Sequence, residues 1–169
     1  MITVASPIYL PNDVIITEGK SDFYFFSYYV KKYGITGIGI FPSSGVDSYD
    51  TLISLALGLG RRFVLLTDDD KAGRSAIKRY KKEYLLDNSA FTYGDLIPEF
   101  NGFKLEDLMT NKVKSDASFG TSKSGLSKRD LALFFQEKAV TLEYDLDEET
   151  LKNMERLFKE VRGHLQKSS

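Results

Sequence analysis

The chain has 169 residues, of which 42% are apolar and 28% charged, and its formal net charge is −1. This length and composition are typical of one globular domain with a substantial core, and the small net charge provides no overall attraction to nucleic acid or membranes. Because there is no cysteine and only one histidine, disulfides and thiolate zinc sites are excluded and Ser–His catalysis is disfavoured. Any bound metal must therefore have oxygen ligands, which favours Mg²⁺ or Mn²⁺. No segment approaches the ~20 apolar residues of a membrane helix, and we expect a cytoplasmic protein with no membrane partner.

Strand and helix patterns alternate along the first two thirds of the chain. Short apolar runs bounded by glycine or polar residues predict buried strands, and longer segments with apolar residues every three to four positions predict helices. In chain order the expected elements are strand 13–18, helix 20–33, strand 35–41, helix 47–59, strand 63–66, helix 74–84, strand 90–97 and a short helical piece at 104–109. The alternation predicts an α/β fold with a parallel sheet and right-handed crossovers.

The C-terminal part of the chain is expected to pack on this core. Residues 110–130 are poor in large apolar groups and rich in Ser, Lys and Gly, which predicts a basic mobile loop. Two helices are predicted after it, at 131–140 and 148–165. The expected organisation is a lead-in segment (1–12), a core (13–110), and a region (111–169) in which the loop and the terminal helices pack on the core.

The segment Phe63–Gly73, FVLLTDDDKAG, contains the main chemical signal. Its apolar run leads directly into Asp68, Asp69 and Asp70, at the end of a strand where an open α/β sheet binds its ligand. Adjacent carboxylates repel one another unless a cation or a basic neighbour compensates them. We therefore expect a divalent-metal site, with Asp68 and Asp70 on one side of the extended chain and Asp69 on the other. The structural alternative is a solvated turn.

A second acidic motif follows the first predicted strand. Glu18 and Asp22 are spaced i, i+4, which places Asp22 one helical turn from Glu18. If the first and third strands are neighbours, these two carboxylates converge with Asp68 and Asp70, a number that suits one or two hard cations. Two such ions can hold the attacking and leaving oxygens of a phosphodiester. Alternatively, Asp22 is only an early-turn acid favoured by the helix dipole.

Together the two motifs resemble those of the TOPRIM domain. Glu-Gly-Lys-Ser-Asp at 18–22 and Asp-x-Asp-x-x-Gly at 68–73 match it in order, type and strand context, over about residues 13–110. That domain is shared by type IA and type II topoisomerases, bacterial primases, OLD-family nucleases, RecR-type repair proteins and ribonucleases that mature 5S ribosomal RNA. The resemblance implies a Rossmann-like sheet of about four mainly parallel strands flanked by helices. It also implies Mg²⁺ held by Asp68 and Asp70, with Glu18 as a metal ligand or general acid/base.

Within this family the chain is most similar to the C-terminal nuclease domain of OLD (overcoming lysogenization defect) endonucleases. That similarity implies a further acid, Glu106, and a lysine near the scissile phosphate, for which Lys128 is the first candidate and Lys123 and Lys112 are alternatives. OLD proteins normally join TOPRIM to an ABC-type ATPase, but this chain has no GxxxxGK[ST] loop. We expect either a stand-alone protein or the C-terminal part of a longer one.

The leading hypothesis is a Mg²⁺- or Mn²⁺-dependent endonuclease that hydrolyses DNA with two metal ions. The residues assigned to catalysis are Glu18, Asp68, Asp70 and Lys128, and those assigned to the metal are Glu18, Asp22, Asp68, Asp70 and Glu106. One alternative is a ribonuclease that matures structured RNA, and another is a non-catalytic assembly module in an anti-phage or repair complex. The expected partners are nucleic acid, DNA ahead of RNA, and an ABC-type ATPase domain or subunit. A homodimer is left open.

Overall fold

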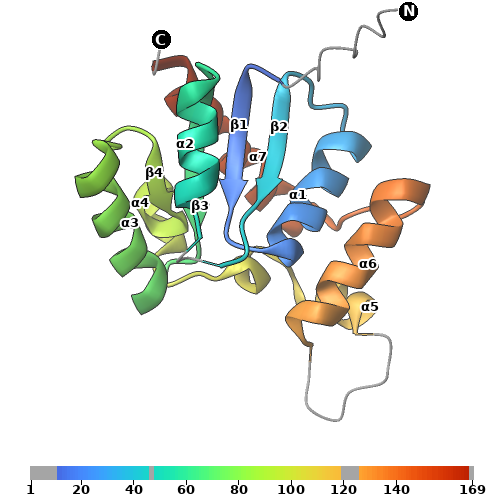
Figure 1. Cartoon of the computed structure of the whole chain (residues 1–169). Helices are drawn as coiled ribbons and strands as arrows, with labels where there is room; N and C mark the ends of the chain where they lie inside the picture. Colours follow the sequence, from blue (N-terminus) through green and yellow to red (C-terminus); the bar gives the residue numbers. More distant parts are fainter. Residues whose placement is uncertain (1–10, 46–47, 119–125, 168–169) are drawn as a thin grey trace, which may run out of the picture.

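The short apolar runs form a four-stranded parallel sheet with the strand order β2-β1-β3-β4 (Figure 1). The computed structural model describes residues 11–45, 48–118 and 126–167. The strands are β1 (Asp13–Thr17), β2 (Ile38–Pro42), β3 (Arg62–Thr67) and β4 (Ala90–Thr92). The predicted α/β class, with a Rossmann-like sheet flanked by helices and an extra C-terminal helix, is confirmed.

The pairing of β1 with β3 brings the two acidic motifs to one edge of the sheet. Val14 is paired with Phe63 and Thr17 with Leu66 in a parallel register. Glu18, directly after β1, is therefore level with Thr67, and Asp68 follows one residue further along at the same carboxyl edge, where α/β sheets bind ligands. The adjacency of the first and third strands, on which the predicted site depends, is confirmed.

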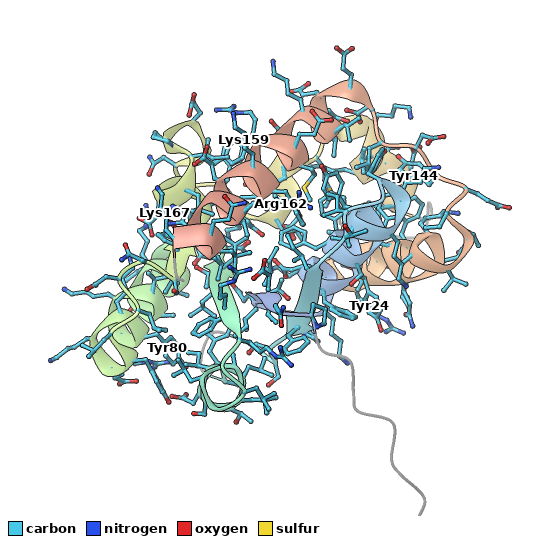
Figure 2. All side chains as sticks on the ribbon, turned by 90° about the horizontal axis from the view of Figure 1, so that it is seen from above. Tyr24, Tyr80, Tyr144, Lys159, Arg162 and Lys167 are labelled. Atoms are coloured by element: carbon cyan, nitrogen blue, oxygen red, sulfur yellow. The ribbon has the colours of Figure 1, made fainter. Side chains whose placement is uncertain are left out.

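Two helical layers cover the sheet. The helices are α1 (Lys20–Lys32), α2 (Asp50–Gly58), α3 (Lys71–Tyr84), α4 (Tyr93–Leu96), α5 (Asn111–Ala117), α6 (Lys128–Thr141) and α7 (Glu148–Lys167), with short 3₁₀ turns η1 (Pro98–Phe100) and η2 (Leu105–Leu108). Figure 2 shows Tyr80 of α3 on one side of the sheet and Arg162 and Lys167 of α7 on the other. In the described part of the chain, no helix combines the length and apolar character needed to cross a membrane.

Each face of the sheet has its own hydrophobic core. Alternate residues of β1 and β3, such as Val14 and Leu65, pack under α2 and α3 with Ile53 and Tyr80. The residues between them, such as Ile15, pack under α1, α6 and α7. Since successive side chains of a strand point to opposite faces, burial on both faces explains why these strands are continuous apolar runs rather than alternating patterns.

Aromatic packing places α6 beside the middle of α1. The ring of Phe135 on α6 lies 4.6 Å from the ring of Phe25 and 5.2 Å from that of Tyr28, both on α1. The hydroxyl of Tyr28 also donates a 2.6 Å hydrogen bond to the carbonyl of Tyr144, which follows α6. These contacts hold the first turn of α6, which contains Lys128, near the carboxyl edge of β1.

Several predicted segments differ from the structure, and β2, α3 and α6 each begin three residues away from the predicted start. Asn111–Ala117 form α5 where a loop was predicted, because Thr110 caps the helix and two small apolar side chains, Val113 and Ala117, are buried. The predicted strand at 90–97 ends at Thr92, where a capping box with Asp95 starts α4. The helix predicted at 47–59 begins at Asp50. Residues 1–10, 46–47, 119–125 and 168–169 lie outside the described residues, and with them Lys123.

Candidate active site

Three carboxylates from two distant segments lie near one another at the carboxyl edge of β1 and β3, without converging on a single point. The backbone N–H of Asp68 donates a 3.4 Å hydrogen bond to Oε2 of Glu18, fifty positions earlier in the chain. Asp22, on the first turn of α1, is close enough to both for their charges to interact. Asp22 and Asp68 are buried and Glu18 is partly buried. We call Glu18, Asp22 and Asp68 the carboxylate cluster.

Asp68 uses both carboxylate oxygens in contacts with the chain. Its Oδ1 accepts a 2.8 Å hydrogen bond from the backbone N–H of Leu105, and its Oδ2 lies 3.2 Å from the Lys128 ammonium. The first contact anchors the loop before η2 to the end of β3. The second brings α6, which is remote in sequence, into the site.

Burial and like charge disfavour ionisation of Asp22. The Tyr93 hydroxyl (3.3 Å) and the Ser21 hydroxyl (3.4 Å) donate long hydrogen bonds to its carboxylate oxygens. Desolvation and then repulsion from Asp68 raise the pKa of Asp22 to about 7, and the nearby Lys128 opposes the shift only in part. The pKa of Glu18 is also raised, first by burial and then by the charge of Asp68.

Lys128 supplies the one positive charge in contact with the carboxylate cluster among the described residues. Partial burial disfavours its ammonium, but attraction from Asp68, Asp22 and Glu18 outweighs this and raises the pKa of Lys128. One ammonium opposes three carboxylates, so the cluster has an excess of negative charge. It therefore either retains a proton on Asp22 at neutral pH or attracts a further cation.

The three consecutive aspartates after β3 point to three different partners. Asp69 accepts a 2.6 Å hydrogen bond from the backbone N–H of Gly102 and pairs with Arg74 at 3.3 Å. Asp70 caps α3 by accepting from the N–H of Gly73 at 2.9 Å, which lowers the pKa of Asp70, and it pairs with Lys104 at 3.4 Å. Asp70 still contributes to the raised pKa of Glu18 through its charge. As their side chains lie, Asp69 and Asp70 stabilise loops and a helix start.

Two further predicted site residues, Glu106 and Lys112, lie outside the carboxylate cluster. Glu106 is in η2, next to Leu105. Among the described residues, its side chain forms no hydrogen bond with the carboxylate cluster. Lys112 pairs with Asp116 along α5 at 3.6 Å. Of the two candidate lysines that the structure describes, Lys128 contacts the cluster and Lys112 does not.

The ligand atoms at this edge are of a type that suits a divalent cation, but they are not arranged to hold one. Carboxylate oxygens are the ligands that Mg²⁺ and Mn²⁺ prefer. Burial and then the charge of Asp68 raise the pKa values of Glu18 and Asp22, and a bound cation would stabilise their ionised forms. Within residues 11–45, 48–118 and 126–167, however, no three acidic or histidine side chains are grouped closely enough to hold a metal ion. Lys128 lies against Asp68, so metal binding requires this ammonium to move and the carboxylates to turn inward.

Sequence reasoning did not identify Tyr93 as part of this site. Tyr93 is buried, and its hydroxyl contacts Asp22 across seventy-one positions of the chain. The residue directly follows β4, so it reaches the same edge of the sheet as Glu18 and Asp68. The signal in the sequence is its position as a polar side chain directly after a strand. The predicted strand at 90–97 hid this position, because it extended past Thr92.

Gly73 is predicted to tolerate no side chain. A Cβ at this position would overlap the backbone carbonyl oxygen of Asp68 and lie 2.8 Å from Oγ1 of Thr67. We expect Gly73→Ala to lower the free energy of unfolding by about 2 kcal/mol, because the start of α3 must shift away from the end of β3. Urea unfolding measures this.

The matched control is Gly163→Ala on α7, where a Cβ would meet nothing within 4 Å. That change should be neutral or stabilising by roughly 0.5–1 kcal/mol, because alanine favours the helix. A Gly73→Ala protein as stable as the wild type would show that α3 is not packed this closely against Asp68.

Comparisons with known proteins bring no further assignment to this site. Neither protein-family descriptions, nor curated proteins, nor solved structures show a match to the chain. The observations that bear on function are therefore the parallel sheet, the carboxylate cluster at its carboxyl edge, and the contact of Lys128 with Asp68.

Proposed function

We propose that the protein is a cytoplasmic, divalent-metal-dependent endonuclease that hydrolyses phosphodiester bonds of DNA, as a TOPRIM nuclease of the OLD type. The observation that supports this most is that Glu18, Asp22 and Asp68 lie near one another at the carboxyl edge of the sheet, with Lys128 in contact with Asp68. Three mutually repelling carboxylates and one lysine are a set suited to binding a cation and a phosphate together.

In this proposal the chain's own residues divide the work between cation and phosphate. Glu18, Asp22 and Asp68 would hold Mg²⁺ or Mn²⁺, and Asp70 and Glu106 are candidate ligands for a second ion after side-chain rotation. When bound, these ions would activate water and stabilise the charge that develops on the phosphate. Lys128 would leave Asp68 and pair with a phosphate oxygen, because the ion would take over its role in neutralising that carboxylate.

The perturbed pKa values favour a functional site over a purely structural one. Buried groups whose pKa is shifted by burial and a specific neighbouring charge are concentrated at functional sites. Asp22 meets both conditions, with burial and Asp68 as the two largest causes of its raised pKa. A non-catalytic assembly module has no physical need for three carboxylates that destabilise one another.

Cleavage assays with the wild-type protein test the proposal. Supercoiled plasmid DNA and a structured RNA are incubated separately with Mg²⁺, with Mn²⁺ and with EDTA. We expect the DNA to be nicked or cut in the presence of either ion and to remain intact in EDTA. Cleavage of RNA alone would support the ribonuclease instead, and absence of cleavage of both substrates, also after addition of an ABC-type ATPase partner, would reject the hydrolase.

A further inference from the structure

A pocket of about 960 Å³ opens beside the carboxylate cluster. Three parts of the chain form its walls: the turn from β1 into α1, the loop from β2 into α2, and one side of α6. Glu18, Asp22 and Lys128 belong both to the pocket and to the candidate active site. A molecule that fills the pocket therefore lies next to the place where a phosphate would react.

One part of the pocket wall is suited to phosphate and sugar groups. Ser43 and Ser44 each place a hydroxyl 2.9 Å from that of Ser48, which draws the loop after β2 into a cluster of hydroxyls. Lys20 and Arg129, both exposed, add positive charge. Among the described residues, the N-cap residues of α1 and α2, Gly19 and Tyr49, form no side-chain cap hydrogen bond, whereas Asp70 and Ser127 cap α3 and α6.

Another part of the wall is apolar and suited to a flat ring. Tyr24 of α1, labelled in Figure 2, lines the pocket together with Leu52, Ala132 and Leu133. Leu133 is 48% exposed, on the side of α6 that faces the pocket, while the other side of this helix packs against the core. Aromatic side chains such as Tyr24 stack nucleic-acid bases without regard to their sequence, and the neighbouring apolar side chains can cover the rest of the ring.

We propose that this pocket binds an unpaired nucleotide of the strand that is cut, next to the scissile phosphate. The proposal rests on the nuclease function proposed above and specifies its substrate as a single-stranded segment or a strand end. The base would lie against Tyr24 and Leu133, and its phosphate and sugar near Arg129 and the serines. A base paired within a duplex cannot enter such a pocket unless it leaves the stack, which costs a few kcal/mol.

Binding measured in EDTA tests this independently of cleavage. Fluorescence anisotropy is recorded with a labelled single-stranded DNA oligonucleotide, with the RNA of the same sequence, and with the corresponding DNA duplex. We expect the wild type to bind single strands more tightly than the duplex. Comparison of its affinities for the DNA and the RNA oligonucleotide shows whether deoxyribose or ribose is preferred. Leu133→Glu and Arg129→Glu should each weaken single-strand binding about tenfold, the loss expected when stacking or phosphate contacts are removed.

Matched controls lie on surfaces away from the pocket. Val140→Glu places the same charge on α6 at a residue that is 80% exposed and does not line the pocket, and Lys152→Glu reverses an exposed charge on α7. Both should bind single strands like the wild type. Tighter binding of the duplex, or unchanged single-strand binding by Leu133→Glu and Arg129→Glu, would overturn the inference and leave the nuclease proposal standing. If Leu133→Glu and Arg129→Glu weaken single-strand binding but the wild type cleaves nothing in Mg²⁺, the nuclease proposal is rejected and the pocket remains a nucleotide-binding site.

Discussion

Asp68→Asn is expected to lower metal-dependent cleavage by at least about 1000-fold while the fold is retained. Asparagine has the same size, and its side-chain oxygen can still accept the hydrogen bond that Leu105 donates to Oδ1 of Asp68. The neutral amide, however, no longer attracts a cation or the Lys128 ammonium, which lies 3.2 Å from Oδ2. The loss should therefore appear in the chemical step and in the dependence on metal concentration rather than in folding.

Single-turnover cleavage measured over a range of Mg²⁺ concentrations, together with urea unfolding, checks this prediction. The matched control is Asp87→Asn, which removes an exposed carboxylate on the loop before β4, remote in sequence from the carboxylate cluster. The control should cleave at the wild-type rate. An Asp68→Asn protein that retains cleavage within a factor of ten of the wild type would remove Asp68 from the catalytic machinery.

In the absence of divalent ions, the protein is expected to lose stability as the pH rises from 5 to 8. Burial and the charge of Asp68 raise the pKa of Asp22 from 3.8 to about 7 in the folded state. The folded protein then binds a proton that the unfolded chain has already released, so the free energy of unfolding falls with increasing pH through this range. For this one group the expected loss is about 2–3 kcal/mol. The raised pKa of Glu18 acts in the same direction.

Urea unfolding in EDTA at several pH values measures this dependence. Asp22→Asn should flatten the profile and be more stable than the wild type at pH 8, since its amide does not ionise. Addition of Mg²⁺ should restore stability to the wild type at pH 8, because an ion that binds only the folded state stabilises it by mass action. Wild-type stability that stays constant or rises from pH 5 to 8 in EDTA would contradict the raised pKa of Asp22.

Much of the fold and the core of the site could be predicted from the sequence. Runs such as Val14–Ile16 and Phe63–Leu66 have enough local apolar character to define buried strands, and their alternation with helical segments indicates a parallel sheet. A parallel sheet brings all strand ends to one edge, so the approach of Glu18 to Asp68 required in addition only that β1 and β3 be neighbours, which the structure shows. The resemblance to OLD nucleases implied Lys128 as the first candidate lysine, and in the structure its ammonium contacts Asp68.

Other features could not be predicted because they depend on contacts between distant segments. The sequence Asp68-Asp69-Asp70 contains no information on which carboxylate faces the cluster, since Gly73, Lys104 and Gly102 decide it by competing for the side chains.

The amino-acid sequence by itself determined the parallel α/β sheet and the strand ends at which acids accumulate, because hydrophobic periodicity and strand-end chemistry are local properties. Only the tertiary structure decided that Asp70 caps α3, that Tyr93 reaches Asp22, and that α5 is helical. It alone also revealed the pocket beside α6. Hydrogen-bond partners, burial and the resulting pKa shifts depend on which distant segments pack together, and no short-range pattern encodes that choice.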